Sequence, residues 1–288
     1  MADLSQEDRA IIERAAGLLR LEAPVVGKLA GGSRNRCYRL TCRTSDVVVR
    51  IAGPGDDDYA VAREAESLSQ RVAASRDLAP QLLLVDREAG FTVMQYAAGP
   101  VWSRQFAASP GGAARLGAWL RRLHAVAVPH DLHEVSFAAN LEHYCAALEP
   151  TSVAPALIDE ARRIARVCDP GRQRVLCHND LHHLNLVESP QGLLAVDWEY
   201  AGIGAPVMDL AGFVAYHDLG ERSLAALLDA YEGARTGITR DDVIAARGLF
   251  EAVWWAWLEL HHSRQRGERP GDAAVRRRLA RRLGAPSA

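Results

Sequence analysis

The segment 176–197 constrains the possible fold more than any other part of this chain. Two short apolar runs, Leu184–Val187 and Leu193–Val196, are separated by a stretch that contains proline and glycine. This order predicts a strand, a turn and a second strand. Because two antiparallel strands joined by a turn return to the end where they began, Asn185 and Asp197 are expected to lie together at the open end of the hairpin.

The polar side chains of this segment have the chemistry of phosphoryl transfer. Asp180 offers a carboxylate to orient an acceptor hydroxyl and take its proton, and Asn185 and Asp197 offer the oxygen ligands that Mg²⁺ prefers. In the kinase catalytic loop four residues separate the Asp from the Asn, and the separation is the same here. We therefore predict Asp180 as the catalytic base and Asn185 and Asp197 as ligands of Mg²⁺. In the alternative interpretation, Asp180 and Asn185 are turn residues that cap backbone amides.

At these residues the chain resembles the aminoglycoside phosphotransferase and choline kinase superfamily. The likeness is greatest to bacterial thiamine kinases and choline kinases, and it rests on the motifs Val196–Gly202 and Met208–Ala211. It extends to the N-terminal part of the chain through Leu29–Tyr38 and Val47–Ile51. The resemblance also implies that Asp209 braces the catalytic loop by hydrogen bonding and that His178 ties the loop to the core.

The resemblance implies an α+β, bilobal fold like that of protein kinases. The expected N-lobe, residues 1–96, binds the nucleotide with a five-stranded sheet and one helix, and the expected C-lobe, residues 97–288, is mainly helical and holds the catalytic loop, the metal and the acceptor. Apolar patterns agree with this division. They predict a first helix that ends near Leu21, a second from about Tyr59 to Ala74, and five strands at 25–30, 37–42, 47–51, 81–85 and 91–96.

Several N-lobe residues are expected to bind ATP. Adjacent glycines let the backbone approach phosphate oxygens closely, so the turn made by Gly31, Gly32 and Ser33 is expected to cover the nucleotide. Asn35 is positioned as in the related small-molecule kinases. In the kinase-like fold, backbone groups near the hinge read the adenine edge, which here implies Gln95 and Ala97.

Arg50 stands where protein kinases carry the lysine that contacts the α- and β-phosphates. A guanidinium binds phosphate bidentately, so the exchange preserves the function. An acidic residue in the following helix is expected to pair with Arg50. Glu66 is preferred because its spacing from Arg63 is similar to the pattern of the family that the chain resembles, and Glu64 is the second candidate. In the alternative interpretation, both lie on a solvated helix face.

The acceptor must be recognised by the C-terminal half of the chain. Phe250, Trp254, Trp257 and His261 recur at helical spacing and form one stripe. Such a stripe is either core packing or an aromatic wall for a cation, which cation–π attraction would stabilise by roughly 0.5–2 kcal/mol per contact. Glu199 is a further candidate to face the cation.

Composition excludes other classes of protein. With 288 residues, 49% of them hydrophobic, the chain can bury the core of two lobes, and a net charge of −2 makes no electrostatic case for nucleic acid. The five cysteines include no Cys-x-x-Cys pair, which argues against a zinc site. The N-terminus lacks the charged and apolar regions of a signal peptide, and no stretch stays apolar for the thickness of a bilayer, so a cytoplasmic protein without membrane contact is expected.

The sequence thus predicts an ATP- and Mg²⁺-dependent kinase that phosphorylates the hydroxyl of a small cationic alcohol such as choline, ethanolamine or thiamine. One alternative is an aminoglycoside or amino-sugar phosphotransferase, which would share the catalytic residues. Another is a catalytically inactive nucleotide-binding module. The oligomeric state is left open.

Overall fold

The computed structural model describes residues 4–29, 35–53, 63–129, 132–149, 151, 153–168, 170–232, 237–264 and 271–284. The chain forms two compact units. The first comprises Met1–Trp102 and Leu184–Trp198, and the second Ser103–His183 and Glu199–Ala288. The segment that holds Asn185 and Asp197 therefore belongs with the N-terminal unit. The functional division into a nucleotide-binding lobe and a catalytic lobe after residue 96 stays a prediction.

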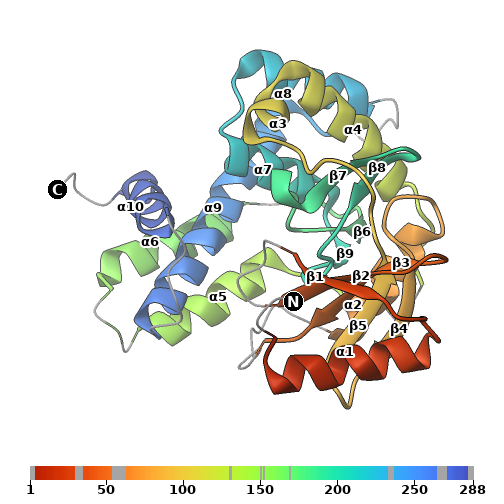
Figure 1. Cartoon of the computed structure of the whole chain (residues 1–288). Helices are drawn as coiled ribbons and strands as arrows, with labels where there is room; N and C mark the ends of the chain where they lie inside the picture. Colours follow the sequence, from red (N-terminus) through yellow and green to blue (C-terminus); the bar gives the residue numbers. More distant parts are fainter. Residues whose placement is uncertain are drawn as a thin grey trace. The chain divides into compact units, whose positions relative to one another are not determined.

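The first unit contains a five-stranded antiparallel sheet (Figure 1). Its order is β1-β2-β3-β5-β4, with bounds Val25–Lys28, Arg36–Thr41, Asp46–Ile51, Phe91–Gln95 and Leu82–Asp86 respectively. Apolar side chains alternate along the central strands, so one face packs against the helix α1, Gln6–Leu18. Leu40 and Val49 from the sheet and Ala15 from α1 are fully buried in this core. The predicted α+β class with a five-stranded sheet is confirmed.

Helix α1 is joined to the sheet by a polar contact at its first turn. The Ser5 side chain caps the helix by accepting a hydrogen bond from the Asp8 amide at 3.1 Å. The Asp8 carboxylate accepts hydrogen bonds from the Tyr38 hydroxyl at 2.6 Å and from Arg36 Nε at 2.9 Å. The helix is therefore held on β2 by both apolar packing and a buried carboxylate.

The predicted hairpin exists, but its first strand begins later than the sequence suggested. Leu184 and Asn185 lie in a 3₁₀ turn, η1, His183–Asn185, and strand β7 runs over Leu186–Ser189. It pairs with β8, Gly192–Ala195, in a register that sets Leu186 opposite Ala195. The shift arises because the His178–Asn185 loop closes with a helical turn, so the apolar Leu184 points outward and is 56% exposed.

The hairpin β7–β8 is attached to the rest of the first unit on both edges. The stretch that follows the sheet pairs with β7 through a Val101–Val187 bridge and a hydrogen bond from the Trp102 amide to the Leu186 carbonyl at 2.9 Å. On the other edge, the Ala195 amide donates to the Leu78 carbonyl, beyond the end of α2, Arg63–Ala74. The open end of the hairpin is therefore fixed relative to the sheet and α2.

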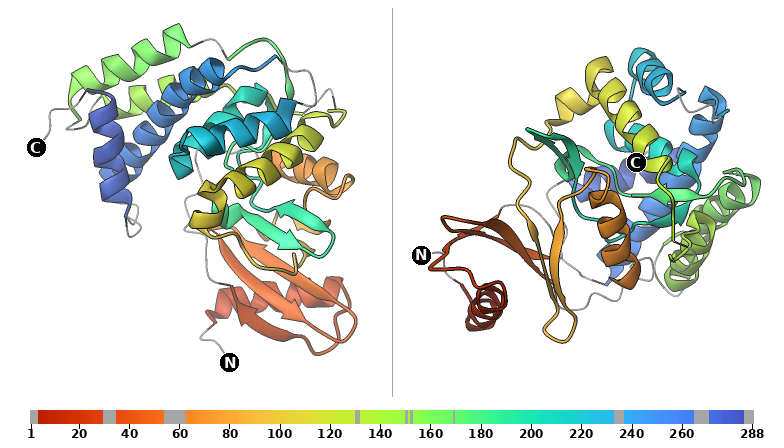
Figure 2. Two further views of the ribbon diagram at one scale, coloured as in Figure 1. Left: turned by 90° about the horizontal axis from the view of Figure 1, so that it is seen from above. Right: turned by 90° about the vertical axis from the view of Figure 1, so that its right-hand side faces the viewer.

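The second unit is mainly helical (Figure 2). Helix α7, Pro206–His217, is buried along almost its whole length. Helix α4, Pro110–His124, packs on α8, Glu221–Glu232. The long helix α9, Arg240–Ser263, packs on α7, on α8 and on three further helices. These are α5, Phe137–Leu148, α6, Pro155–Val167, and α10, Asp272–Arg282, which group together in Figure 2. The unit is completed by the short helix α3, Arg104–Ala108, and by the strand pair β6, Val175–Cys177, and β9, Gly202–Gly204.

Among the described residues, no helix combines the length and the apolar character that crossing a bilayer requires. The cytoplasmic location stays a prediction.

Candidate active site

The loop that leads to Asp180 is held by a buried carboxylate from α7. Asp209 is 1% exposed and accepts hydrogen bonds from two consecutive backbone amides, those of His178 at 3.0 Å and Asn179 at 2.6 Å. Its carboxylate also contacts His124 Nε2 at 3.0 Å, and the other ring nitrogen of His124 lies 2.7 Å from the Tyr231 hydroxyl. Asp209 thus ties α7, the end of α4 and the loop together, which is the bracing contact that the resemblance implied.

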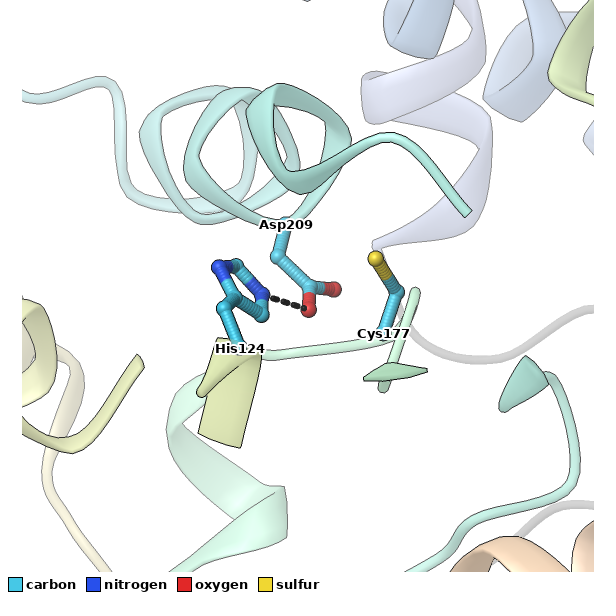
Figure 3. Close-up of side chains that lie close together, drawn as sticks. All are labelled: His124, Cys177 and Asp209. Carbon is cyan, nitrogen blue, oxygen red and sulfur yellow. Dashed lines mark hydrogen bonds and ion pairs between the residues drawn. The ribbon is translucent and has the colours of Figure 1, made fainter. Parts of the chain in front are cut away.

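His124, Cys177 and Asp209 have their potential ligand atoms within 4.8 Å of one another, and all three are buried (Figure 3). Burial and the nearby Asp209 carboxylate raise the pKa of the Cys177 thiol well above its usual value, so the thiol is protonated within this cluster. The Asp209 oxygens already receive the loop amides and His124. The cluster is therefore a hydrogen-bonded structural brace.

The backbone immediately before Asp180 adopts an uncommon conformation. Asn179 has φ +66°, in the left-handed region that Asn tolerates better than most residues. Its amide is held by Asp209 and its side-chain Nδ2 donates to the Tyr200 carbonyl at 2.9 Å. These contacts stabilise a bend of the backbone after β6. The backbone geometry of Asn179 therefore fixes the position of the Asp180 Cα atom, from which its side chain extends.

The Asp180 carboxylate contacts residues of its own unit. Its Oδ1 accepts a hydrogen bond from the Tyr216 hydroxyl at 2.5 Å, and its Oδ2 lies 3.8 Å from His182 Nε2. The Asp180 amide donates to His178 Nδ1 at 3.3 Å, a contact within the loop, and the expected role of His178 in tying the loop to the core stays a prediction. Tyr216 was not among the residues predicted from the sequence.

The two predicted metal ligands flank the hairpin, with Asn185 just before β7 and Asp197 two residues after β8. The Val196 amide donates to the Asn185 carbonyl at 2.9 Å, one step beyond the pair of Leu186 with Ala195. Asp197 comes next, with φ +64°, a conformation that is rare for residues other than Gly, Asn and Asp. Both side chains thus lie at the open end of the hairpin, as predicted.

Arg50 joins this end of the hairpin to α2. Its guanidinium donates to Glu66 Oε1 and, at 2.8 Å, to Asp197 Oδ1. The side chains of Arg50 and Glu66 are 8% and 7% exposed, whereas that of Asp197 is 32% exposed. Glu66 is therefore the partner of Arg50, as preferred from the sequence, and the side chain of Glu64 lies outside the described residues.

The remaining nucleotide-binding candidates are only partly described. Gly31, Gly32 and Ser33 lie outside the described residues, and Asn35, just before β2, is 7% exposed. Gln95 is the last residue of β5, and its amide donates a hydrogen bond to the Gln81 carbonyl. Ala97 lies in the segment that follows β5, which contacts β7 through the bridge of Val101 with Val187. Their roles toward ATP stay predictions.

The aromatic stripe of α9 is only partly core. Trp255, which is outside the stripe, is fully buried, whereas Trp254 and Trp257 are half-buried. The Trp254 ring meets the Tyr216 ring edge-on, with centroids 4.7 Å apart. Trp257 instead stacks on His261, with centroids 3.8 Å apart. Only the Tyr216 ring therefore separates Trp254 from Asp180. Glu199 is buried and is the first residue of the second chain segment of the second unit.

Three residues of this region escaped the sequence analysis: His124, Tyr216 and Tyr231. His124 and Tyr231 lie 85 and 107 residues from their partners Asp209 and His124, and Tyr216 lies 36 residues from Asp180. No local pattern marks such contacts. The position of Tyr216, two helical turns after Asp209 on the same helix, was the one signal available.

Comparison with known proteins supports the resemblance. The model of the phosphotransferase enzyme family matches residues 25–243, more than half of the chain. A thiamine kinase from Salmonella paratyphi A is 30% identical over 199 residues, 68% of this chain and 65% of that protein. Protein LicA of Haemophilus influenzae is 27% identical over 108 residues, 35% of this chain and 40% of that protein. The matched part therefore spans less than two thirds of the length of these two relatives.

Solved structures show the same fold. Choline kinase LicA from Streptococcus pneumoniae superposes with a TM-score of 0.81 at 22% identity, over 97% of this chain and 99% of that one. A macrolide 2'-phosphotransferase, MphH from Brachybacterium faecium, superposes with a TM-score of 0.66 at 18% identity, over 97% and 99% of the two chains. The predicted superfamily is confirmed, and the chain belongs to the phosphotransferase enzyme family.

Proposed function

We propose that this chain is an ATP- and Mg²⁺-dependent kinase that transfers the γ-phosphoryl group to the hydroxyl of a small alcohol. The observation that carries the proposal is the contact of Arg50 with both Glu66 and Asp197. A buried guanidinium placed between two carboxylates has little structural advantage over apolar packing. It does suit a site that binds phosphate groups together with a metal.

The donor set at the hairpin end fits Mg²⁺. This hard cation prefers oxygen ligands. Asn185 offers an amide oxygen just before the hairpin, and Asp197 offers a carboxylate just after it. Arg50 contacts Asp197 Oδ1, and among the residues that the structure describes no hydrogen bond to Oδ2 is present. Bound Mg²⁺ would neutralise charge on the phosphates, and these two residues would hold it.

Each of the other residues has one task in the proposed reaction. Arg50 binds phosphate oxygens, and Glu66 orients the guanidinium. Asp180 accepts the proton of the acceptor hydroxyl while the acceptor oxygen bonds to the γ-phosphorus and the bond to the ADP oxygen breaks. Asp209 keeps the backbone before Asp180 in place and does no chemistry.

The finer proposal is that the acceptor is a cationic alcohol of the choline, ethanolamine or thiamine type. Trp254 supports it, because the ring is half-buried and in contact with Tyr216, whose hydroxyl reaches Asp180. A half-buried indole face near the base can attract a cationic group that has lost part of its water. The relatives described as thiamine kinase and choline kinase are consistent with this class of acceptor.

A coupled assay of ADP release tests the proposal. The purified chain is incubated with ATP, Mg²⁺ and, in turn, choline, ethanolamine, thiamine, amino sugars and aminoglycosides. Acceptor-dependent release with a cationic alcohol is expected. Release of ADP only with amino sugars or aminoglycosides would show that the acceptor belongs to that class instead. No release of ADP with any of these alcohols would overturn the kinase activity itself.

The variant Asp180→Asn tests the assignment of the base. It is expected to lower kcat by about 10²–10⁴, the usual contribution of a positioned acid–base group, and to leave ATP binding nearly intact. Asp229→Asn makes the same chemical change at an exposed position on α8 and serves as the control. A turnover of Asp180→Asn close to that of this control would show that Asp180 is not the base.

A further inference from the structure

We propose that Tyr216 is a positioning residue that keeps water away from the base. Its hydroxyl donates a hydrogen bond to the Asp180 carboxylate when no acceptor is bound. When an acceptor binds, the acceptor hydroxyl replaces the Tyr216 hydroxyl as the partner of Asp180. The inference rests on the proposed function, because it assigns Tyr216 a part in the same transfer reaction. Its consequence is that cleavage of ATP is coupled to the presence of an acceptor.

The contact between Tyr216 and Asp180 is short and specific. The hydroxyl lies 2.5 Å from Asp180 Oδ1, the distance of a strong hydrogen bond from a hydroxyl to a carboxylate. Tyr216 and Asp209 are seven residues apart on α7, so they lie on the same face of the helix. One helix therefore holds the loop twice, through its backbone by Asp209 and through the Asp180 side chain by Tyr216.

Three aromatic rings set the direction of the Tyr216 side chain. Its ring packs edge-on against Trp254 at 4.7 Å, against Phe250 at 5.3 Å and against His182 at 5.3 Å, measured between centroids. Phe250 is buried, but Tyr216 and Trp254 are half-buried. The ring is thus held by three aromatic neighbours and is still partly accessible to solvent.

The hydroxyl of Tyr216 makes the contact that the acceptor needs. In the transfer, Asp180 takes the proton of the attacking oxygen, that oxygen bonds to the γ-phosphorus, and the bond from phosphorus to ADP breaks. If water is the attacking molecule, the same changes release inorganic phosphate and ADP. Tyr216 donates to the oxygen of Asp180 that would otherwise bind such a water, and only an acceptor with its own binding contacts would displace it.

The test separates transfer from hydrolysis in Tyr216→Phe, which removes the hydroxyl and keeps the ring. With ATP and Mg²⁺, ADP release is measured without acceptor, and the phosphorylated alcohol is measured at saturating acceptor. The ratio of hydrolysis to transfer is expected to rise by about tenfold, the value of one hydrogen bond to a charged group. Tyr216→Gln, which restores a donor, is expected to recover part of the coupling.

Tyr38→Phe is the matched control, because Tyr38 also donates to a buried aspartate, Asp8, at 2.6 Å, in the first unit. It is expected to lower stability without changing the ratio. An unchanged ratio in Tyr216→Phe, or a proportional fall of both activities, would overturn the inference by showing that Tyr216 only supports the structure. If Tyr216→Phe fails to fold, Tyr216→Leu is measured by the same criteria.

The failure of this inference differs from the failure of the proposed function. Wild-type protein that phosphorylates no alcohol refutes the kinase proposal, whatever Tyr216 does. Wild-type protein that transfers phosphate normally, beside a Tyr216→Phe variant with the same coupling, refutes only the role of Tyr216.

Discussion

Replacing Asp209 by asparagine should damage both the stability and the catalysis of this protein, although Asp209 is not expected to touch a substrate. The carboxylate accepts from the amides of His178 and Asn179 and contacts His124. An asparagine of the same shape can accept from one of the two amides, but its NH₂ group would face the other. One buried amide would then lose its partner and the contact with His124 would be weakened.

The size of the effect follows from these contacts. A hydrogen bond to a charged group contributes about 1.5–3 kcal/mol, so the loss of about two such bonds lowers the free energy of unfolding by about 3–6 kcal/mol. For domains of this size, one kcal/mol shifts the melting temperature by about 2–4 °C, which predicts a fall on the order of 10 °C. Because the loop that bears Asp180 loosens, kcat is expected to fall by about 10–100-fold.

Thermal unfolding and steady-state kinetics measure the two effects. Asp218→Asn is the control, since Asp218 ends the same helix, and asparagine tolerates its φ of +50°. Its side chain is 54% exposed and pairs with Arg247 and Arg282, so its loss should change stability by less than about 1 kcal/mol. Equal melting temperatures for the two variants would refute the brace, and a lower melting temperature with normal kcat would refute its role in placing Asp180.

Three further outcomes are expected. Asp197→Ala should abolish turnover at any practical Mg²⁺ concentration, because it removes a carboxylate that the metal and Arg50 both need; full recovery in excess Mg²⁺ would show that Asp197 is peripheral. Trp254→Ala should raise KM for a cationic alcohol about tenfold with KM for ATP unchanged, whereas Trp255→Ala, at a fully buried position, should lower stability by about 3–5 kcal/mol with the acceptor preference intact; the opposite pattern would place the pocket elsewhere. Burial lowers the pKa of His217 to about 4, so the unfolded chain binds a proton more readily than the folded protein. The free energy of unfolding should therefore fall by on the order of 3 kcal/mol as the pH drops from 6.5 to 4. Urea unfolding of His217→Gln should show a flatter dependence of this free energy on pH, and an unchanged dependence would disprove the assignment.

Much of the fold could be predicted from local pattern. The strands of the sheet and the hairpin that bears Asn185 and Asp197 were recognisable because alternation, turn residues and helix caps are properties of neighbours in the chain. The first strand of the hairpin was placed two residues early, since an apolar run does not distinguish a strand from a 3₁₀ turn that exposes Leu184. Residue types at set spacing likewise indicated the candidate base and metal ligands.

Only the tertiary structure shows which side chains contact the candidate site residues. Glu66 was preferred over Glu64 as the partner of Arg50, and its contact with the guanidinium depends on how α2 lies against the sheet. Tyr216, His124 and Tyr231 were not predicted at all, because their contacts join segments that are 36 to 107 residues apart. The partly exposed Trp254 and the buried Trp255 are neighbours in the chain, and only the packing of α9 on α7 sets one toward Tyr216 and the other into the core. A sequence specifies the chemistry that each residue carries, whereas contact across long stretches of chain depends on packing that no local pattern encodes.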